Sequence, residues 1–326
     1  MRTYLFLLAG LALGGATAGG GPKPARPPDP APWKSAPAVR PGISAGNVFF
    51  YYSDLNKAWA FYRDVFGFET VADYGTARIL RVAPASYLTL VNAARGMHTA
   101  EEPKTVALAL LTEDVEGWAA HLQERGVPFK YALKVRPGSA HDGCVALDPE
   151  GYFLEIERFN PHPENERLMP VWKRLSPLRT EPAAGVPAPP VLGFKGTVVW
   201  LYYPALAPLE KFYEETLGLA LIVDQGWAKI YPASPTAFIG LVDGARGMHK
   251  PTPRKGVTVS FFVRDIRGWF EALSAVPSFR LRKPEIEANP RFEAFVGYDP
   301  EGYFLEFDAF RGHPDNRRLL ECLAGR

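Results

Sequence analysis

Two pairs of acidic residues hold the clearest potential for chemistry in this 326-residue chain. Glu155 and Glu157 alternate along one predicted strand, and Glu306 and Asp308 alternate along another. Residues two apart on a strand share a face, so either pair could work as an acid and a base with separated pKa values. We favour a simpler arrangement, in which a nearby Arg or Tyr satisfies the first acid and water solvates the second, because no further catalytic group is visible. Glu155 and Glu306 are the candidate catalytic residues.

Histidine is the other residue type that could do chemistry here. Four of the six histidines occur at equivalent positions in two parts of the chain, namely His98, His162, His249 and His313. Together with Glu155 and Glu306 they are the candidate metal ligands, since imidazole and carboxylate groups suit Zn, Fe or Mn. One such site would combine His98, His162 and Glu155. A loop His followed by Pro, as at His162 and His313, more often caps a helix or bonds backbone, so we predict no cofactor and keep a divalent metal as the alternative.

Arg95 and Arg246 each belong to an Arg-Gly-Met-His sequence. A guanidinium group in such a loop could clamp an anionic group of a ligand. We expect a surface ion pair at each arginine instead.

These residues recur because most of the chain is repeated. Residues 148–155, Asp-Pro-Glu-Gly-Tyr-Phe-Leu-Glu, return unchanged at residues 299–306, and 299 − 148 gives an offset of 151. The Arg-Gly-Met-His sequences fit the same offset. A repeat of this length has the size of a whole domain, so we expect domains at residues 43–173 and 194–323, joined by a linker at residues 174–193.

Within each copy the pattern strand, helix, three strands occurs twice. Runs of β-branched and aromatic residues predict the strands. In copy one, Asp54 and Asp114 are predicted to cap helices that stop at Gly67 and Gly126. In copy two, helices are expected at residues 209–217 and 266–273, with Pro208 in the first turn of the former. Each copy is therefore predicted to be a pair of βαβββ units.

The order of these motifs resembles that of the vicinal oxygen chelate superfamily, which includes glyoxalase I, bleomycin-resistance proteins, fosfomycin-resistance transferases and extradiol dioxygenases. The resemblance covers residues 44–160 and 195–311. It rests on Asp54-Leu55, Phe61-Tyr62, Phe66-Gly67-Phe68 and residues 148–155. It implies an α+β fold of two tandem domains, each a pair of βαβββ units that form a cupped, mostly antiparallel sheet with helices outside.

The resemblance also implies where a metal would bind. Metal-using members take ligands from the first and last strands of each unit, and the corresponding positions here are Asn47, Thr89, Ala107 and Glu155 in copy one, and Val198, Gly240, Thr258 and Glu306 in copy two. A divalent ion needs three or more donors, and only the Glu matches in each copy. Aromatic residues share these strand faces, which favours an organic ligand. The predicted ligand-binding residues are Asn47, Phe49, Tyr51, Trp200, Tyr202 and Thr258.

The first 18 residues are predicted to be an export signal. Arg2, an apolar run over residues 4–13 and Ala16-Thr17-Ala18 have the order of a secretory signal peptide, residues 1–18, with cleavage expected after Ala18. A Pro- and Gly-rich tether follows at residues 19–42. We therefore expect a secreted or periplasmic protein, without membrane insertion after cleavage. Export permits a disulfide, yet we expect Cys144 to be a small buried hydrophobic residue.

Three functions stay open at this point. The formal net charge of +2 comes without a basic run, so a nucleic-acid partner is not expected. The first possibility is metal-free binding of a small organic molecule, as in the bleomycin-resistance branch. The second is an enzyme, a lyase, isomerase or dioxygenase, with a displaced metal site or the Glu pairs. The third is a degenerate pair of domains that serves assembly, including assembly into a homo-oligomer.

Overall fold

The structure is a computed structural model that describes residues 40–179 and 192–325. The predicted signal peptide, most of the predicted tether and most of the predicted linker lie outside the described residues. Within the described ranges, none of the helices has the length and apolar character needed to span a bilayer.

Copy one consists of two βαβββ units, as predicted. The first comprises β1 (Ile43–Tyr52), α1 (Leu55–Phe66), β2 (Glu69–Asp73), β3 (Ala77–Ala83) and β4 (Ser86–Asn92), followed by the short helix η1 (Ala93–Arg95). The second comprises β5 (Val106–Leu111), α2 (Val115–Glu124), β6 (Phe129–Lys134), β7 (His141–Leu147) and β8 (Phe153–Phe159). It is followed by η2 (Pro163–Asn165), α3 (Met169–Arg174) and β9 (Leu178–Arg179).

Copy two repeats this order after the short strand β10 (Gly193–Phe194), which pairs with β9. Its first unit comprises β11 (Gly196–Tyr203), α4 (Ala207–Lys211), η3 (Phe212–Thr216), β12 (Val223–Asp224), β13 (Ala228–Pro232) and β14 (Ala237–Asp243). Its second unit comprises β15 (Val257–Val263), α5 (Ile266–Ser274), β16 (Arg280–Leu281), β17 (Glu287–Ala288), β18 (Phe292–Tyr298) and β19 (Phe304–Phe310). The chain continues through η4 (Pro314–Asn316) and α6 (Arg317–Leu323).

The predicted helix caps of copy one are confirmed. The Asp54 side chain accepts a hydrogen bond from the Lys57 N–H, and Gly67 ends α1 with a φ of 69°. Asp114 accepts in the same way from the Gly117 N–H at the start of α2. The first helix of copy two differs from the prediction, because it begins at Ala207 and turns into the π-helical segment η3. Proline in its first turn suits a helix start, but no side chain caps this end.

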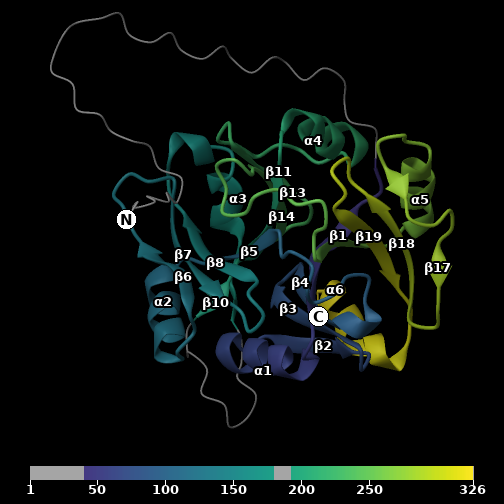
Figure 1. The fold of residues 1–326 in the computed structure, drawn as a ribbon, viewed down its shortest axis with the longest axis horizontal. Helices are drawn as coiled ribbons and strands as arrows, with labels where there is room; N and C mark the ends of the chain where they lie inside the picture. Colours follow the sequence, from purple (N-terminus) through teal and green to yellow (C-terminus); the bar gives the residue numbers. More distant parts are fainter. Residues whose placement is uncertain (1–39, 180–191, 326) are drawn as a thin grey trace, which may run out of the picture.

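The strands form two large sheets, and each sheet combines strands of both copies. The β1 sheet has the order β16-β18-β19-β15-β1-β4-β3-β2, with β17 beside β18. The β11 sheet has the order β12-β13-β14-β11-β5-β8-β7-β6. Figure 1 shows this exchange, with the yellow strands β18 and β19 in the same sheet as purple β1. The first unit of each copy therefore pairs with the second unit of the other, which the sequence did not predict.

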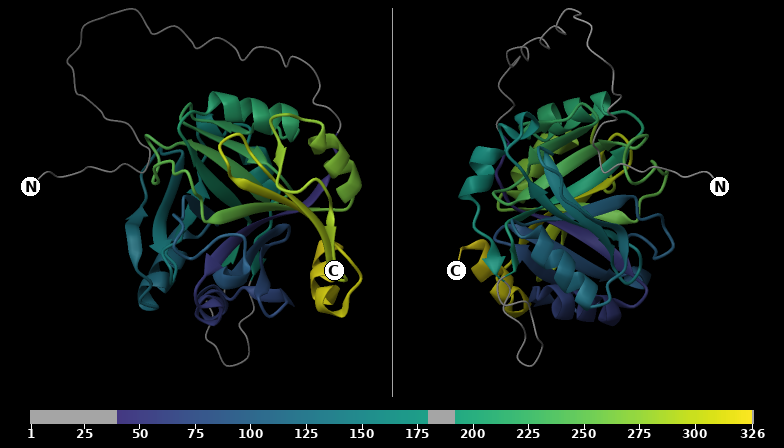
Figure 2. Two further views of the ribbon diagram at one scale, coloured as in Figure 1. Left: turned by 45° about the vertical axis from the view of Figure 1, so that its right-hand side comes forward. Right: turned by 90° about the vertical axis from the view of Figure 1, so that its left-hand side faces the viewer.

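Antiparallel contacts join the copies at the centre of each sheet. β1 pairs with β15, and β11 pairs with β5. Both sheets are strongly curled, and the helices lie at the periphery (Figure 2). The α+β class and the cupped, mostly antiparallel sheets are confirmed. We call the two concave faces the β1 cup and the β11 cup.

The main core lies on the face of the sheets that carries the helices. It includes Leu55 of α1, Trp118 of α2, Leu209 of α4 and Trp269 of α5, packed against strand residues of both copies. Cys144 is fully buried in this core, as predicted, and its thiol is free.

The repeated Asp-Pro-Glu-Gly-Tyr sequence holds the two copies together. Asp148 is 5% exposed and accepts hydrogen bonds from the hydroxyls of Tyr52 and Tyr62, at 2.6 and 3.0 Å. The hydroxyl of Tyr152 accepts from the N–H of Tyr51 and donates to the carbonyl of Gly256 in copy two. This tyrosine therefore bridges the start of β15 to β1.

Copy two makes the reciprocal connection. Asp299 accepts from the hydroxyls of Tyr203 and Tyr213, and the hydroxyl of Tyr303 accepts from the N–H of Tyr202. The same hydroxyl donates to the carbonyl of Thr105 in copy one. The prediction that this turn is mostly architectural agrees with these contacts.

Candidate functional site

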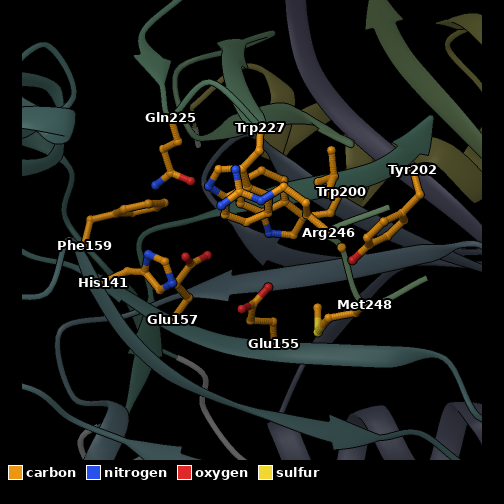
Figure 3. A pocket seen from close by; sticks show the side chains of 12 residues that line it. His141, Glu155, Glu157, Phe159, Trp200, Tyr202, Gln225, Trp227, Arg246 and Met248 are labelled. Atoms are coloured by element: carbon orange, nitrogen blue, oxygen red, sulfur yellow. The ribbon is translucent and has the colours of Figure 1, made fainter. Parts of the chain in front are cut away.

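The β11 cup contains an open cavity, whose empty space of about 510 Å³ includes part of the solvent at its mouth. Its walls come from β7 and β8 of copy one and from β11, β14 and two loops of copy two. The residues that line it are His141, Glu155, Glu157, Phe159, Trp200, Tyr202, Gln225, Trp227, Val242, Arg246, Gly247 and Met248. The cavity exists only because the copies exchange units. Figure 3 shows Glu155 and Glu157 on one side, facing Trp200 and Arg246 on the other.

Strand alternation places the two acids and the aromatic wall. Glu155, Glu157 and Phe159 alternate along β8, and Trp200 and Tyr202 alternate along β11, so each set shares a face. The prediction that the two acids share a face with each other is confirmed, because both line one cavity.

Two glycines make room for these side chains. Trp200 lies over Gly240, where an added Cβ would come within 2.0 Å of the indole ring. Gly143 pairs with Glu157 across the β7–β8 ladder, so no side chain stands opposite this acid. A Cβ at Gly143 would approach the Ile156 carbonyl oxygen to 2.4 Å. Glycine is therefore required at both places by close packing.

The acid pair is buried, and no arginine or lysine within the described ranges forms an ion pair with it. Glu155 is 6% exposed and Glu157 is 2% exposed. Burial raises the pKa of Glu155 to about 7. Burial and the nearby charge of Glu155 raise the pKa of Glu157 well above its ordinary value. Within the described residues Glu155 has no Arg or Tyr partner of the kind we expected. The expected solvation of Glu157 is also wrong, because this side chain is buried.

The Trp200 indole faces both acids across the cavity (Figure 3). It favours their ionised forms and so opposes the effect of burial on both pKa values. Its Nε1 is nevertheless not aligned for a hydrogen bond with either acid, and Oε2 of Glu157 is also buried without a partner. Two residues of the cavity wall thus hold a donor and an acceptor that no described residue satisfies.

Several cavity residues were not predicted. His141 lies beside Glu157 (Figure 3), its Nδ1 is buried without a partner, and burial lowers its pKa. Gln225 and Trp227 come from the loop between β12 and β13. The guanidinium of Arg246 lies 5.3 Å from the centre of the Trp227 ring. In the described part of the chain neither Arg246 nor Arg95 makes the ion pair that we expected.

The other predicted ligand-binding residues lie in the β1 cup. Asn47, Phe49 and Tyr51 alternate along β1, and the Tyr51 hydroxyl is 2.8 Å from Oγ1 of Thr258. Asn47 accepts a hydrogen bond from Thr89, while its Nδ2 is buried without a partner. The predicted set is therefore divided, with Trp200 and Tyr202 in one cup and the remaining four residues in the other.

The second acid pair, Glu306 and Asp308, is part of the β1 sheet. Burial raises the pKa of Asp308 to about 6, whereas the hydroxyl of Ser260, which donates to it at 2.6 Å, opposes that rise. Burial and the charge of Asp308 raise the pKa of Glu306, and the positive charge of Arg282 opposes that rise. Ser260 thus supplies a hydrogen-bond partner to Asp308, whereas Oε2 of Glu306 is buried without one.

The candidate metal ligands do not converge. His98 is buried, and its Nδ1 lies 2.7 Å from Oε2 of Glu102. His162 and His313 each accept a backbone N–H at the start of a short helix, as predicted for a His followed by Pro. His249 stacks on Phe153, and burial lowers its pKa to about 4. Among the described residues no three His, Cys, Asp or Glu side chains form a group able to hold a metal ion.

The positions carried over from metal-using relatives are also redistributed by the exchange. We expected one set in each copy. Instead, Asn47 and Thr89 share a sheet with Thr258 and Glu306, while Val198 and Gly240 share the other with Ala107 and Glu155. The β11 cup then offers a single donor at these positions. At these positions the residues of the β11 cup do not fit the family's metal site.

The buried acids predict a specific pH dependence of stability. Burial raises the pKa of Glu155 from 4.5 to about 7, so the folded state holds more protons than the unfolded state between these values. Stability should therefore fall as the pH rises through this window. Replacing both Glu155 and Glu157 by Gln should remove about 1–3 kcal/mol of that fall, since one pKa unit corresponds to about 1.4 kcal/mol.

Urea unfolding at pH 5 and pH 8 measures this difference. The exposed Glu271 of α5 provides a surface control, and Glu271→Gln should leave the wild-type pH dependence unchanged. If the double variant lost as much stability between the two pH values as the wild type, the acids would not carry the predicted proton uptake.

Comparisons with known proteins agree with this fold. Residues 45–156 match the model of the Glyoxalase/Bleomycin resistance protein/Dioxygenase superfamily. No curated protein matches the chain. Glyoxalase I from Zea mays is similar in structure, with a TM-score of 0.55 and 16% identity over 86% of this chain and 95% of that one. A putative dioxygenase from Bacillus subtilis has a TM-score of 0.56 and 15% identity over 83% of this chain and 86% of that one.

The fold is thus of the α+β class, with paired βαβββ units that form cupped sheets. The match of residues 45–156 relates copy one to the glyoxalase, bleomycin-resistance and dioxygenase superfamily, and the whole chain shares its fold with glyoxalase I. The resemblance to the vicinal oxygen chelate superfamily is confirmed. At these identities the structural neighbours establish the fold alone.

Proposed function

We propose that this protein binds a small organic molecule in the β11 cup without the metal site typical of its superfamily. The observation that carries the proposal is the open cavity between the copies, with aromatic walls and two buried acids at its base. Ligand sites are typically concave and mostly apolar, with a few polar groups that fix orientation. Trp200, Trp227 and Phe159 supply the apolar walls, and the acids supply the polar groups.

The absence of a metal is a separate part of this proposal. It is supported by the donors at the family's ligand positions, where the β11 cup has only Glu155. The export signal expected at residues 1–18 stays a prediction, and the mass of the mature protein, with Gly19 at its N-terminus, would support it.

Thermal-shift screening against a small-molecule collection tests the binding function. A ligand at a concentration of 100 times its Kd should stabilise the protein by about 2.7 kcal/mol. Trp200→Ala should abolish most of this effect, because it removes the indole that faces the acids. Trp227→Ala, at the rim, should weaken it to a smaller degree.

A matched control keeps this test specific. Trp59 of α1 is partly exposed, lies outside the cavity and stacks against Arg63 and Arg78. Trp59→Ala should respond to the ligand like the wild type. The proposal fails if no small-molecule class stabilises the wild type, or if Trp200→Ala keeps the full response.

A further inference from the structure

The acid pairs of the two cups have different polar surroundings. In the β1 cup, the Ser260 hydroxyl donates to Asp308, and the charge of Arg282 favours the ionised form of Glu306. In the β11 cup, Glu155 and Glu157 have no ion-pair partner within the described residues. Each cup has one carboxylate oxygen that is buried without a partner, Oε2 of Glu157 and Oε2 of Glu306. The two cups therefore differ at the positions of Ser260 and Arg282.

Sequence and register agree on these positions. The offset of 151 maps Ser260 onto Ala109 and Arg282 onto Tyr131. The Arg282 N–H donates to the carbonyl of Val296, which pairs with Glu306. In the other sheet, Tyr131 pairs with Val145, which pairs with Glu155. Tyr131 therefore occupies the position beside the β11 acids that the exposed Arg282 occupies beside the β1 acids.

A buried acid pair that forms no ion pair is costly unless a partner is supplied, and Arg246 lines the same cavity without an ion pair to either acid. The shape of the β11 cup indicates where that partner enters, because the acids lie at the base of an open cavity rather than in closed packing. Trp200, Trp227, Tyr202 and Phe159 line the space in front of them. Aromatic faces beside carboxylates are a favourable surrounding for an organic cation.

We propose that the β11 cup binds a small organic amine in its protonated form, with the ammonium group on Glu155 and Glu157 and the apolar body between the aromatic residues. This inference rests on the proposed function and specifies its ligand class. The β1 cup, with Arg282 and Ser260 in place, does not take such a ligand. Arg246 lies at the rim beside Trp227 and restricts the outward end of the ligand to a neutral or anionic group.

Tryptophan fluorescence titration of the full protein tests the ligand class with three matched probes. These are 2-phenylethylamine, 2-phenylethanol and phenylacetate, which place a cation, a neutral hydroxyl and an anion on similar bodies. At neutral pH the amine should bind at least about tenfold more tightly than the alcohol, and phenylacetate more weakly than either.

Two variants locate the preference. Tyr131→Arg supplies the β11 cup with the cation found in the β1 cup, so the amine should lose its advantage over the alcohol. Glu157→Gln should lower the affinity for the amine about tenfold or more and leave the affinity for the alcohol within about twofold. Glu271→Gln, which removes the same charge from the surface of α5, should match the wild type.

The possible outcomes separate this inference from the proposed function. Equal affinity for the amine and the alcohol would overturn the amine inference and leave small-molecule binding intact. If the protein still preferred the amine after both Tyr131→Arg and Glu157→Gln, the assignment of the amine site to the β11 cup would be overturned. No response to any probe at about 10 mM would also overturn the inference, while the thermal-shift screen with Trp200→Ala decides the binding function independently.

Discussion

Replacing Asp148 by alanine is expected to lower the free energy of unfolding by about 3–5 kcal/mol. Its carboxylate accepts hydrogen bonds from the hydroxyls of Tyr52 and Tyr62 and from two backbone N–H groups of its own turn. Alanine would leave these buried donors without their acceptor, at a cost of about 1–3 kcal/mol for each group that finds no other partner. Urea unfolding followed by tryptophan fluorescence measures the loss.

Two further variants control this experiment. Asp299→Ala removes the equivalent carboxylate of copy two and should have a similar effect. Asp73 is exposed and accepts hydrogen bonds from Gly75 and Arg78, so Asp73→Ala should cost less than about 1 kcal/mol. If Asp148→Ala were no more destabilising than Asp73→Ala, the repeated turn would not anchor the fold.

The second large effect concerns the separated copies. Residues 40–179 expressed alone should not form a folded monomer, because β1 and β5 would both lose the strand that pairs with them in the other copy. β5 is buried along its whole length, and an uncovered apolar edge of this kind promotes association. We expect copy one alone to form dimers or aggregates, as measured by light scattering after size-exclusion chromatography.

Joint expression provides the control. Residues 40–179 and 192–325, made as two chains in one cell, should purify as a 1:1 complex with the secondary structure of the intact protein. Two stable, folded monomers obtained separately would contradict the exchange of units between the copies.

Local sequence signals were sufficient to predict the elements of the fold but not their pairing. Asp54, Gly67 and Asp114 fixed the helix ends of copy one through short-range capping. No local signal selects the strand that pairs with β1, because β5 and β15 are equivalent strands of the two copies. Either would satisfy the same apolar pattern, so composition and periodicity cannot choose between them.

The candidate site was predicted in part for the same reason. Glu155 and Glu157 were placed on one face by alternation, and Trp200 and Tyr202 on another, but the sequence assigned the two groups to different cups. His141 and Trp227 were missed because they lie at a strand end and in a loop. A comparison of the copies would have marked both, since the offset of 151 maps them onto Phe292 and Thr76.

The central claim is that the second unit of copy one and the first unit of copy two together hold a small organic ligand. A crystal structure of the protein grown with 2-phenylethylamine tests this most directly. The expected result is the probe inside the β11 cup, with its ring against Trp200 and its nitrogen within hydrogen-bond distance of Glu155 or Glu157. A probe bound in the β1 cup or only on the surface, with the β11 cup free of it, would contradict the claim.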